Sequence, residues 1–230
     1  MSRLKNIAII PARGGSKRIP RKNIKDFHGK PIIAYSIDAA IKSELFDEVM
    51  VSTDDKEIAL VAKKYGASVP FMRSAKNSDD YATTADVLIE VINDYKEKLN
   101  KTYDNVCCIY PTAPFVTPRK LINSYKIFIE KGADSLIPVV KYSYPPQRSF
   151  ILKGVFLKYR EPKYINSRSQ DLDPIYHDAG QFYWVKKDTL LKNKSLYSNK
   201  TIPFEMSEIE VQDIDNEYDW FLLEMKYQCV

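Results

Sequence analysis

The sequence predicts an α/β fold, built as a mostly parallel, Rossmann-like sheet with helices on both faces. Short apolar runs alternate with helical patterns over the first two thirds of the chain, as expected of βα units. The runs are almost free of polar residues, which is typical of strands buried on both faces. With 230 residues, 44% of them hydrophobic, the chain is long enough for one such domain with a substantial core.

Four apolar runs are expected to form the core strands. They are NIAIIPA (6–12), DEVMVST (47–53), NVCCIYP (105–111) and DSLIPVV (134–140). In the third run, Cys107 and Cys108 should point to opposite faces as small buried hydrophobes. Ligands in such folds bind beyond the carboxyl ends of the strands, so the loops after NIAII, MVS and CCIYP are the expected place of a site.

Helical patterns separate these strands, at residues 31–43, 54–67, 83–98 and 117–133. Pro31 suits a first helical turn, and Ile33, Ile37 and Ile41 are spaced for one helix face. The second helix starts with carboxylates, which favour its positive end. The fourth has the clearest signals: a threonine cap, a proline in the first turn and a glycine at its end.

The pattern changes near residue 141, where Tyr, Pro and short β-like pieces replace the helical periodicity. This segment carries too many large apolar groups for a linker. We therefore expect one domain over residues 1–230, with a β-rich insertion at about 141–178 that pairs with another subunit. An acidic loop and a final helix should follow within residues 202–228.

Composition narrows the possible functions. The net charge of +5 is compatible with an anionic small substrate, and it is below the excess expected of a dedicated nucleic-acid binder. None of the three cysteines belongs to a cluster with zinc-ligand spacing. The first apolar run is too short for a signal peptide, and no stretch approaches the roughly 20 apolar residues of a spanning helix. These features predict a cytoplasmic protein.

The stretch IPARGGSKRIPRKN (10–23) follows the first predicted strand and is strongly basic. Gly14 and Gly15 allow backbone N–H groups to point at an anion. Five cations accompany them: Arg13, Lys17, Arg18, Arg21 and Lys22. The stretch contains neither GxxxxGK[ST] nor GxGxxG. Its place between a strand and a helix favours a phosphate site, and a nucleic-acid arm or a solvated loop are the alternatives.

A pair of carboxylates lies near the end of the chain, in QDIDNEYDW. Asp213 and Asp215 alternate around Ile214, so in an extended segment both side chains lie on one face. Converging carboxylates repel each other unless a cation lies between them, which makes the pair a candidate Mg²⁺ site. The alternative is that Asp215 caps the final helix. A basic loop and a Mg²⁺ site together are the minimum equipment for phosphoryl or nucleotidyl transfer.

Two further segments hold candidate binding residues. In FMRSAKNSDDYATTADV (71–87), Arg73 lies in a loop, and Thr83 or Thr84 would cap the next helix. In RSQDLDPIYHDAGQFYW (168–184), polar groups stand among aromatic ones, as in a sugar or carboxylate site. These groups are Arg168, Gln170, His177, Gln181 and Tyr183. A purely structural role is the alternative for both segments.

Together these segments resemble the CMP-sialic acid synthetases, the acylneuraminate cytidylyltransferases, over essentially the whole chain. The basic stretch is similar to the family's nucleotide loop, A-R-x-x-S-K-x-x-x-x-K-N. YPTAPF (110–115) is similar to Q-P-T-S-P-L, and DIDNEYDW (213–220) to the metal segment D-I-D-x-x-x-D. The matching loop positions are Ala12, Arg13, Ser16, Lys17, Lys22 and Asn23. The first and last motifs are specific when they occur together, and the resemblance implies a nucleotide-diphospho-sugar transferase fold.

The resemblance implies a reaction in which the anomeric hydroxyl of an acidic nine-carbon sugar attacks the α-phosphate of CTP, with Mg²⁺ required. By position, Arg13, Lys17 and Lys22 would be catalytic, with Lys17 the main candidate for stabilising the transition state. The implied nucleotide-binding residues are Ala12, Arg13, Gly14, Ser16, Lys17, Asn23, Arg73 and Thr84. Tyr110 would join the polar groups of residues 168–183 around the sugar, and Asp213 and Asp215 would hold the metal. A homodimer is also implied, in which the middle segment reaches into the neighbour's site.

Two departures from the family pattern bear on the substrate. Arg18 stands where glycine is usual, and Tyr110 stands in the sugar pocket where glutamine is usual. The combination of GGSKRIPRKN and SQDLDPIYHDAGQFYW looks most like the pseudaminic acid cytidylyltransferases, which serve flagellin and surface glycans. The same reaction on N-acetylneuraminic or legionaminic acid is the alternative. A remote alternative is an RNA-binding module that uses the basic loop. A non-catalytic homologue is disfavoured because every catalytic-type position is filled.

Overall fold

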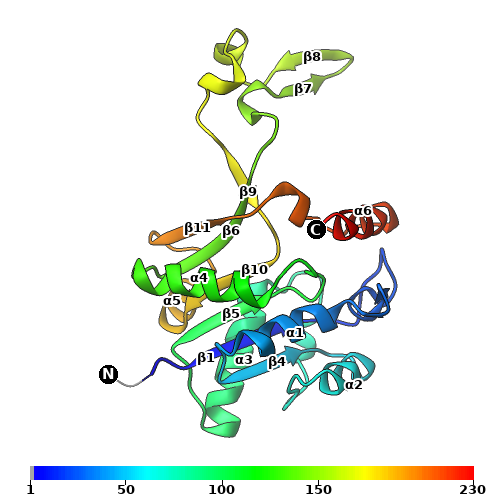
Figure 1. Ribbon diagram of the computed structural model, residues 1–230, viewed down its shortest axis with the longest axis vertical. Helices are drawn as coiled ribbons and strands as arrows, with labels where there is room; N and C mark the ends of the chain where they lie inside the picture. The colour runs from blue at the N-terminus through cyan, green and yellow to red at the C-terminus, as the bar shows by residue number, and fades with distance from the viewer. Residues whose placement is uncertain (1–2) are drawn as a thin grey trace.

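The computed structural model describes residues 3–230, and a seven-stranded sheet forms its centre (Figure 1). Six strands run in the order β11–β6–β10–β5–β1–β4, and the seventh, β9, pairs with β6. Their bounds are β1 (Asn6–Pro11), β4 (Glu48–Ser52), β5 (Asn105–Ile109), β6 (Ser135–Lys141), β9 (Tyr176–Asp178), β10 (Phe182–Lys186) and β11 (Thr201–Glu205). β4, β1 and β5 are parallel, as are β6 and β11, whereas β10 and β9 are antiparallel to their neighbours. The predicted α/β sheet is therefore confirmed.

Residues 3–230 form six α-helices: α1 (Ile33–Ser43), α2 (Lys56–Lys64), α3 (Thr84–Leu99), α4 (Pro118–Glu130), α5 (Lys187–Asn193) and α6 (Glu217–Gln228). α1, α2 and α4 pack on one face and α3 on the other (Figure 1). Strand alternation divides the core in the same way, since Ile10 faces the first layer and Ile9 the second. Cys107 and Cys108 separate likewise, as predicted, and both are fully buried.

Helix starts follow the sequence signals at three of the four predicted helices. Asp55 caps α2, Thr83 caps α3 in a capping box with Asp86, and Thr117 caps α4. The start of α1 differs from the prediction. Pro31 lies in β3 (Lys30–Pro31), which pairs with β2 (Asp26–Phe27) in a short hairpin before the helix.

This hairpin separates the basic stretch from α1, so the stretch does not lead directly into a helix. The hairpin turns at His28 and Gly29, which both have positive φ, of 50° and 87°. The predicted apolar face of α1 is confirmed for Ile33 and Ile37, which are buried, whereas Ile41 is 41% exposed.

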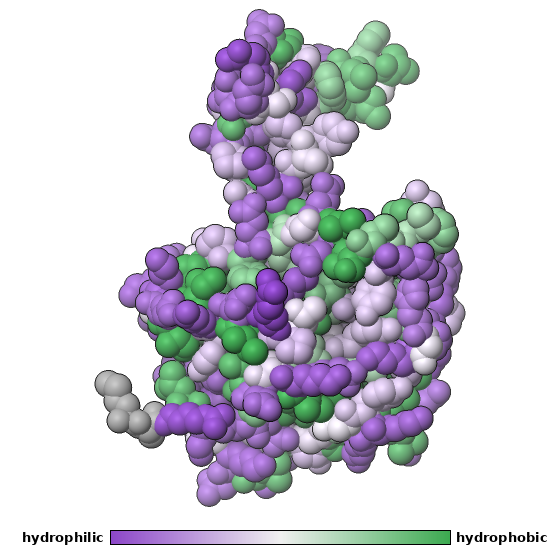
Figure 2. All heavy atoms as spheres, viewed as in Figure 1, coloured by the Kyte–Doolittle hydropathy of each residue, from purple (hydrophilic) through white to green (hydrophobic). Residues whose placement is uncertain are grey.

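Between β6 and β9 the chain leaves the sheet and projects from the body of the molecule (Figure 1). β7 (Phe150–Lys153) and β8 (Phe156–Tyr159) pair there as an antiparallel hairpin that pairs with no other strand of residues 3–230. Its apolar side chains are exposed, with Leu152 at 74% and Phe156 at 70%, and Figure 2 shows them as a hydrophobic patch at the tip. The segment is β-rich, as predicted, and β9 belongs to the main sheet. No helix within residues 3–230 has the length and apolarity needed to cross a bilayer.

Candidate active site

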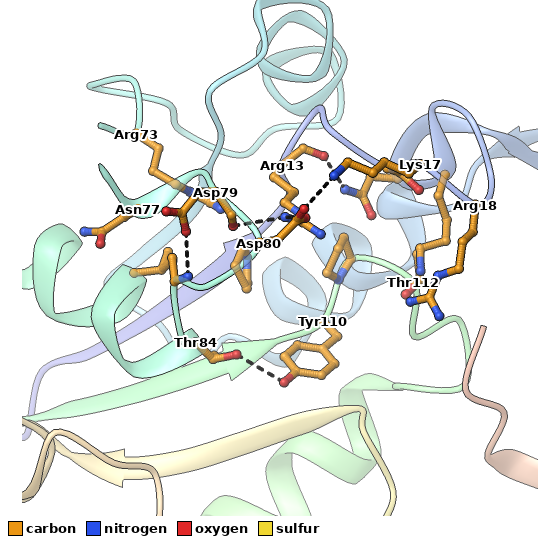
Figure 3. Close-up of a pocket in the computed structure, with 17 residues that line it drawn as sticks. Arg13, Lys17, Arg18, Arg73, Asn77, Asp79, Asp80, Thr84, Tyr110 and Thr112 are labelled. Atoms are coloured by element: carbon orange, nitrogen blue, oxygen red, sulfur yellow. Dashed lines mark hydrogen bonds and ion pairs between the residues drawn. The ribbon is translucent and has the colours of Figure 1, made fainter. Parts of the chain in front are cut away.

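A cavity of about 570 Å³ opens at the carboxyl ends of β1 and β5 (Figure 3). The basic stretch lines one side, and residues 73–84 line the other. Eight residues predicted to act on the substrates share it: Arg13, Ser16, Lys17, Lys22, Asn23, Arg73, Thr84 and Tyr110. Of the three loops predicted to form the site, those after β1 and β5 line this cavity, whereas none of residues 53–55 in the loop after β4 does.

Two of the cations are held by a carboxylate of the opposite wall. Asp80 Oδ1 lies 2.7 Å from Arg13 Nη1, and Asp80 Oδ2 lies 2.6 Å from Lys17 Nζ. Figure 3 shows Asp80 between the two cations. These hydrogen bonds hold the pKa of Asp80 below its usual range. The cavity therefore already binds an anionic group at the point where Arg13 and Lys17 converge.

Hydrogen bonds from its own N–H groups hold the backbone of the basic stretch in place. Ala12 is fully buried and donates its N–H to Ser52 O at 2.9 Å, and Gly14 donates its N–H to Asp54 Oδ1 at 2.9 Å. A Cβ on Gly14 would stand 2.7 Å from Asp55 Oδ2, so a larger residue there would displace that carboxylate. Neither Ala12 nor Gly14 lines the cavity, whereas Asn23 does and also donates to Arg13 O at 2.9 Å.

Arg73 lies on the cavity wall opposite the basic stretch and supplies a cation whose position is fixed. It is 9% exposed, and its Nε donates to Ser52 Oγ at 3.0 Å while Nη2 donates to Ser52 O. Burial lowers the pKa of its guanidinium, and the nearby carboxylates of Asp54 and Glu90 oppose this effect. The side chain is thus held in one place before any ligand binds.

The acidic segment at the start of α6 lies against the basic stretch. Arg18 Nη2 forms an ion pair with Asp215 Oδ1 at 2.7 Å, and Lys22 Nζ donates to Ile214 O at 2.7 Å. Burial lowers the pKa of Lys22, and the charges of Asp215 and Asp213 counteract it. The two predicted motifs are therefore neighbours, although far apart in sequence.

Asp215 does not cap α6. Asn216 takes that position and forms a capping box with Asp219, so the capping interpretation of Asp215 is wrong. Ile214 is buried, while Asp215 is partly exposed and Asp213 is exposed. Within residues 3–230 no three Asp, Glu, His or Cys residues cluster as a complete metal cage. A two-carboxylate site still fits Mg²⁺, which keeps several waters and takes substrate phosphates as ligands.

A second cavity, of about 480 Å³, is also lined by Tyr110. Among the predicted sugar-binding residues, His177 and Tyr183 line it with Tyr110, and so does the predicted metal ligand Asp213. Tyr110 places its hydroxyl 3.2 Å from Thr84 Oγ1 and its ring against that of Tyr183, with centroids 5.4 Å apart. Tyr110 thus joins the two cavities.

The other three predicted sugar-binding residues lie elsewhere in the chain. Arg168 and Gln170 sit in the projecting segment, where Arg168 pairs with Asp171 at 2.7 Å, and neither lines either of these two cavities. Gln181 is 2% exposed and donates to Glu210 O at 2.7 Å, so it ties loops together rather than facing the cavity.

Sequence reasoning missed five charged residues that line the cavities: Asp79, Asp80, Asp178, Glu208 and Lys226. Asp80 lies in a polar run before a helix, where a carboxylate is ordinary. Asp178 stands in the aromatic segment that suggested a sugar site, and that context was the available signal. Lys226 lies in the last helix, and nothing in its neighbours distinguishes it from a surface lysine.

Comparisons with known proteins show what the whole chain is similar to. A pseudaminic acid cytidylyltransferase of Campylobacter jejuni is 43% identical over 226 residues, covering 98% of this chain and 97% of the relative. The CMP-N,N'-diacetyllegionaminic acid synthase of Legionella pneumophila is 37% identical and covers 95% of this chain and 94% of the relative. The structure of a CMP:2-keto-3-deoxy-manno-octonic acid synthetase complexed with CTP shares the fold, with a TM-score of 0.70, 18% identity and coverage of 98% of this chain and 100% of that one. The sequence model of the cytidylyltransferases matches residues 7–224, and the chain therefore belongs to the cytidylyltransferase family.

Proposed function

We propose that this enzyme transfers CMP from CTP to pseudaminic acid, giving CMP-pseudaminic acid and pyrophosphate for flagellin or surface glycan glycosylation. The observation that carries the proposal is the pair of adjoining cavities that share Tyr110, one of them lined by the cations of the basic stretch. The first accommodates CTP and the second the acidic sugar. The names of the two relatives above favour an acylamino nonulosonic acid over other sugars.

In this proposal the triphosphate replaces Asp80 between Arg13 and Lys17, whose charges then neutralise its oxygens. Attack by the sugar hydroxyl forms a bond to the α-phosphorus, the bond from that phosphorus to the bridging oxygen breaks, and the hydroxyl proton is released to solvent. Negative charge grows on the departing pyrophosphate, and Lys17 stabilises it. Lys22, held by Ile214 O, adds a further cation beside the basic stretch.

The remaining nucleotide-binding roles follow from position. The buried backbone at Ala12 and the Asn23 amide fix the loop beneath the nucleotide. Arg73 and Thr84 line the opposite wall and would contact the cytidine and its ribose. Asp213 and Asp215 would hold Mg²⁺, which would neutralise charge on the phosphates when it is bound.

We further propose that the chain is a single cytidylyltransferase domain and acts as a cytoplasmic homodimer. The exposed apolar hairpin β7–β8 supports a partner of the same kind, because an isolated two-stranded hairpin is marginally stable alone in water. Pairing would bring Arg168 and Gln170 of one copy towards the sugar cavity of the other. That arrangement gives both residues a function that they lack within one chain.

The test is pyrophosphate release from CTP with Mg²⁺ and a panel of pseudaminic, legionaminic and N-acetylneuraminic acids. Pseudaminic acid should give the highest kcat/KM, and legionaminic acid is the second candidate. Omission of the sugar is the control. An absence of turnover with every acid, together with RNA binding that weakens steeply as salt rises, would favour the RNA-binding alternative.

A further inference from the structure

The second cavity contains a carboxylate to which no role has been assigned above. Asp178, the last residue of β9, lines it. Its Oδ1 accepts two hydrogen bonds, one from Tyr183 OH at 2.9 Å and one from Gly180 N at 2.7 Å. For Oδ2, no donor is present among residues 3–230. One oxygen therefore fixes the carboxylate and the other is free to accept.

Asp178 is exposed, and its carboxylate is positioned by one donor on a buried residue, Tyr183, and one on an exposed residue, Gly180. Tyr183 is 4% exposed, and its ring packs edge-on against Tyr110, whose hydroxyl contacts Thr84 in the nucleotide cavity. Gly180 has φ of 62°, a left-handed conformation that lets its N–H turn back to Asp178. Asp178 is thus fixed through Oδ1 at the edge of the sugar cavity, and its second oxygen is accessible to a ligand.

The chemistry of an ionised carboxylate limits what it can face. It accepts hydrogen bonds and donates none, and it repels the carboxylate of an acidic sugar. Lys226 of the same cavity offers the matching place for that sugar carboxylate. Two of its three donors go to Val211 O at 2.7 Å and Glu208 O at 3.2 Å, which leaves one for a ligand. A donor group of the sugar must therefore face Asp178.

We propose that Asp178 is a specificity-determining residue that accepts a hydrogen bond from an acylamino N–H of the acidic sugar. The inference rests on the proposed function and adds to it the group of the substrate that is recognised. An amide N–H only donates, so it matches a fixed acceptor, whereas a hydroxyl can reorient to donate or accept. Asp178 would select acylamino acids over their hydroxyl analogues.

The variant Asp178→Asn provides a sharp test. Its Oδ1 can keep the bonds from Tyr183 and Gly180, so its Nδ2 replaces the free oxygen and presents a donor to the sugar N–H. Losing a charged hydrogen bond predicts a rise of about 10- to 100-fold in KM for an acylamino nonulosonic acid, with KM for CTP unchanged within about twofold. For the sugar analogue with hydroxyls in place of the acylamino groups, KM should rise little, because a hydroxyl can accept a hydrogen bond from Nδ2.

Asp188→Asn, which changes an exposed carboxylate of α5 that lines neither cavity, is the control and should leave this selectivity unchanged. Equal KM values for the acylamino acid in Asp178→Asn and wild type would overturn the inference. An equal rise in KM for the acylamino acid and for its hydroxyl analogue would also overturn it. Calorimetric binding of the acylamino acid separates the two proposals. Absence of turnover in the wild type would defeat the proposed function, yet sugar binding weakened only in Asp178→Asn would still support this role.

Discussion

Arg18 and Asp215 form an ion pair, with 2.7 Å between Nη2 and Oδ1, that joins the basic stretch to the acidic segment before α6. The sequence marked Arg18 as a departure from the family pattern without indicating its partner. Both side chains are accessible to solvent, at 68% and 48%. A metal ion that binds Asp215 would therefore have to compete with the Arg18 guanidinium for this carboxylate.

The first prediction concerns this competition. Arg18→Ala should increase the affinity of the protein for Mn²⁺, used as a probe for Mg²⁺, by about two- to fivefold, the range expected for an exposed ion pair. The fraction of free Mn²⁺, measured by electron paramagnetic resonance without nucleotide, reports the change. Arg119→Ala removes an exposed charge of α4 and is the control. Unchanged Mn²⁺ binding in Arg18→Ala would show that Arg18 does not compete.

The second prediction concerns the metal ligands. The double variant Asp213→Asn and Asp215→Asn should lose Mg²⁺-dependent turnover, because neutral amides bind Mg²⁺ far more weakly than carboxylates. Turnover is measured as Mg²⁺ is titrated, with circular dichroism as the check of folding. Glu217→Gln, which alters a carboxylate two residues away that pairs with Lys25, should keep its response to Mg²⁺. A double variant that still responds to Mg²⁺ would move the metal site elsewhere.

The third prediction concerns Lys17. Lys17→Ala should lower kcat by about 100- to 1,000-fold, the usual loss when one preorganised donor to a developing charge is removed. The melting temperature should barely change, since the Lys17 side chain is 79% exposed. Pyrophosphate release and thermal unfolding give the two readouts. Lys42→Ala, an exposed lysine in the last turn of α1, controls for loss of a positive charge. Normal turnover in Lys17→Ala would refute its assigned role.

Local signals account for what the sequence could predict. Thr83 and Thr117 cap helices because their hydroxyls satisfy free N–H groups, and that depends only on nearby residues. The place of the basic stretch after β1 predicted a loop at the carboxyl end of the sheet, and Arg13, Lys17 and Lys22 line the cavity there. Asp80 could not be placed, because its contacts with Arg13 and Lys17 span more than 60 residues and depend on packing of the whole sheet.

The antiparallel placement of β10 was unpredictable for the same reason. Its residues are apolar in every position but the last, as in a parallel core strand, and pairing with β5 and β6 decides its direction. The β2–β3 hairpin escaped prediction because its strands have only two residues each and hold no periodicity.

The fourth prediction concerns the projecting hairpin. Leu152→Asp combined with Phe156→Asp should convert the proposed dimer to monomers, since it places charges in an apolar patch that would be buried by a second copy. Light scattering measures the mass. Lys158→Glu, a charge change in β8 of the same hairpin, is the control. An unchanged dimer in the double variant would exclude the hairpin as the interface.

The fifth prediction concerns the base of the basic stretch, where Arg21 forms a bidentate ion pair with Asp55 at 2.5 and 2.9 Å. This contact is the main cause that lowers the pKa of Asp55 from its ordinary value of 3.8 to about 2, and the backbone N–H groups of Ile58 and Glu57 add to it, while burial opposes it. The folded protein therefore holds the ionised form more strongly than the unfolded chain does. The resulting stabilisation is complete above about pH 5 and is lost as the pH falls through 3.8 towards 2.

Asp55→Asn isolates this contribution, because asparagine can still cap α2 while it loses the charge. We expect a free energy of unfolding about 1 kcal/mol lower than wild type at pH 7, since solvent screens a pair in which Arg21 is 38% exposed. Urea titrations should show the difference shrinking below pH 4 and disappearing near pH 2. Asp171→Asn, which breaks the exposed pair with Arg168, controls for removal of a surface charge. A difference that persisted unchanged at pH 2 would assign the loss to the cap rather than to the ion pair.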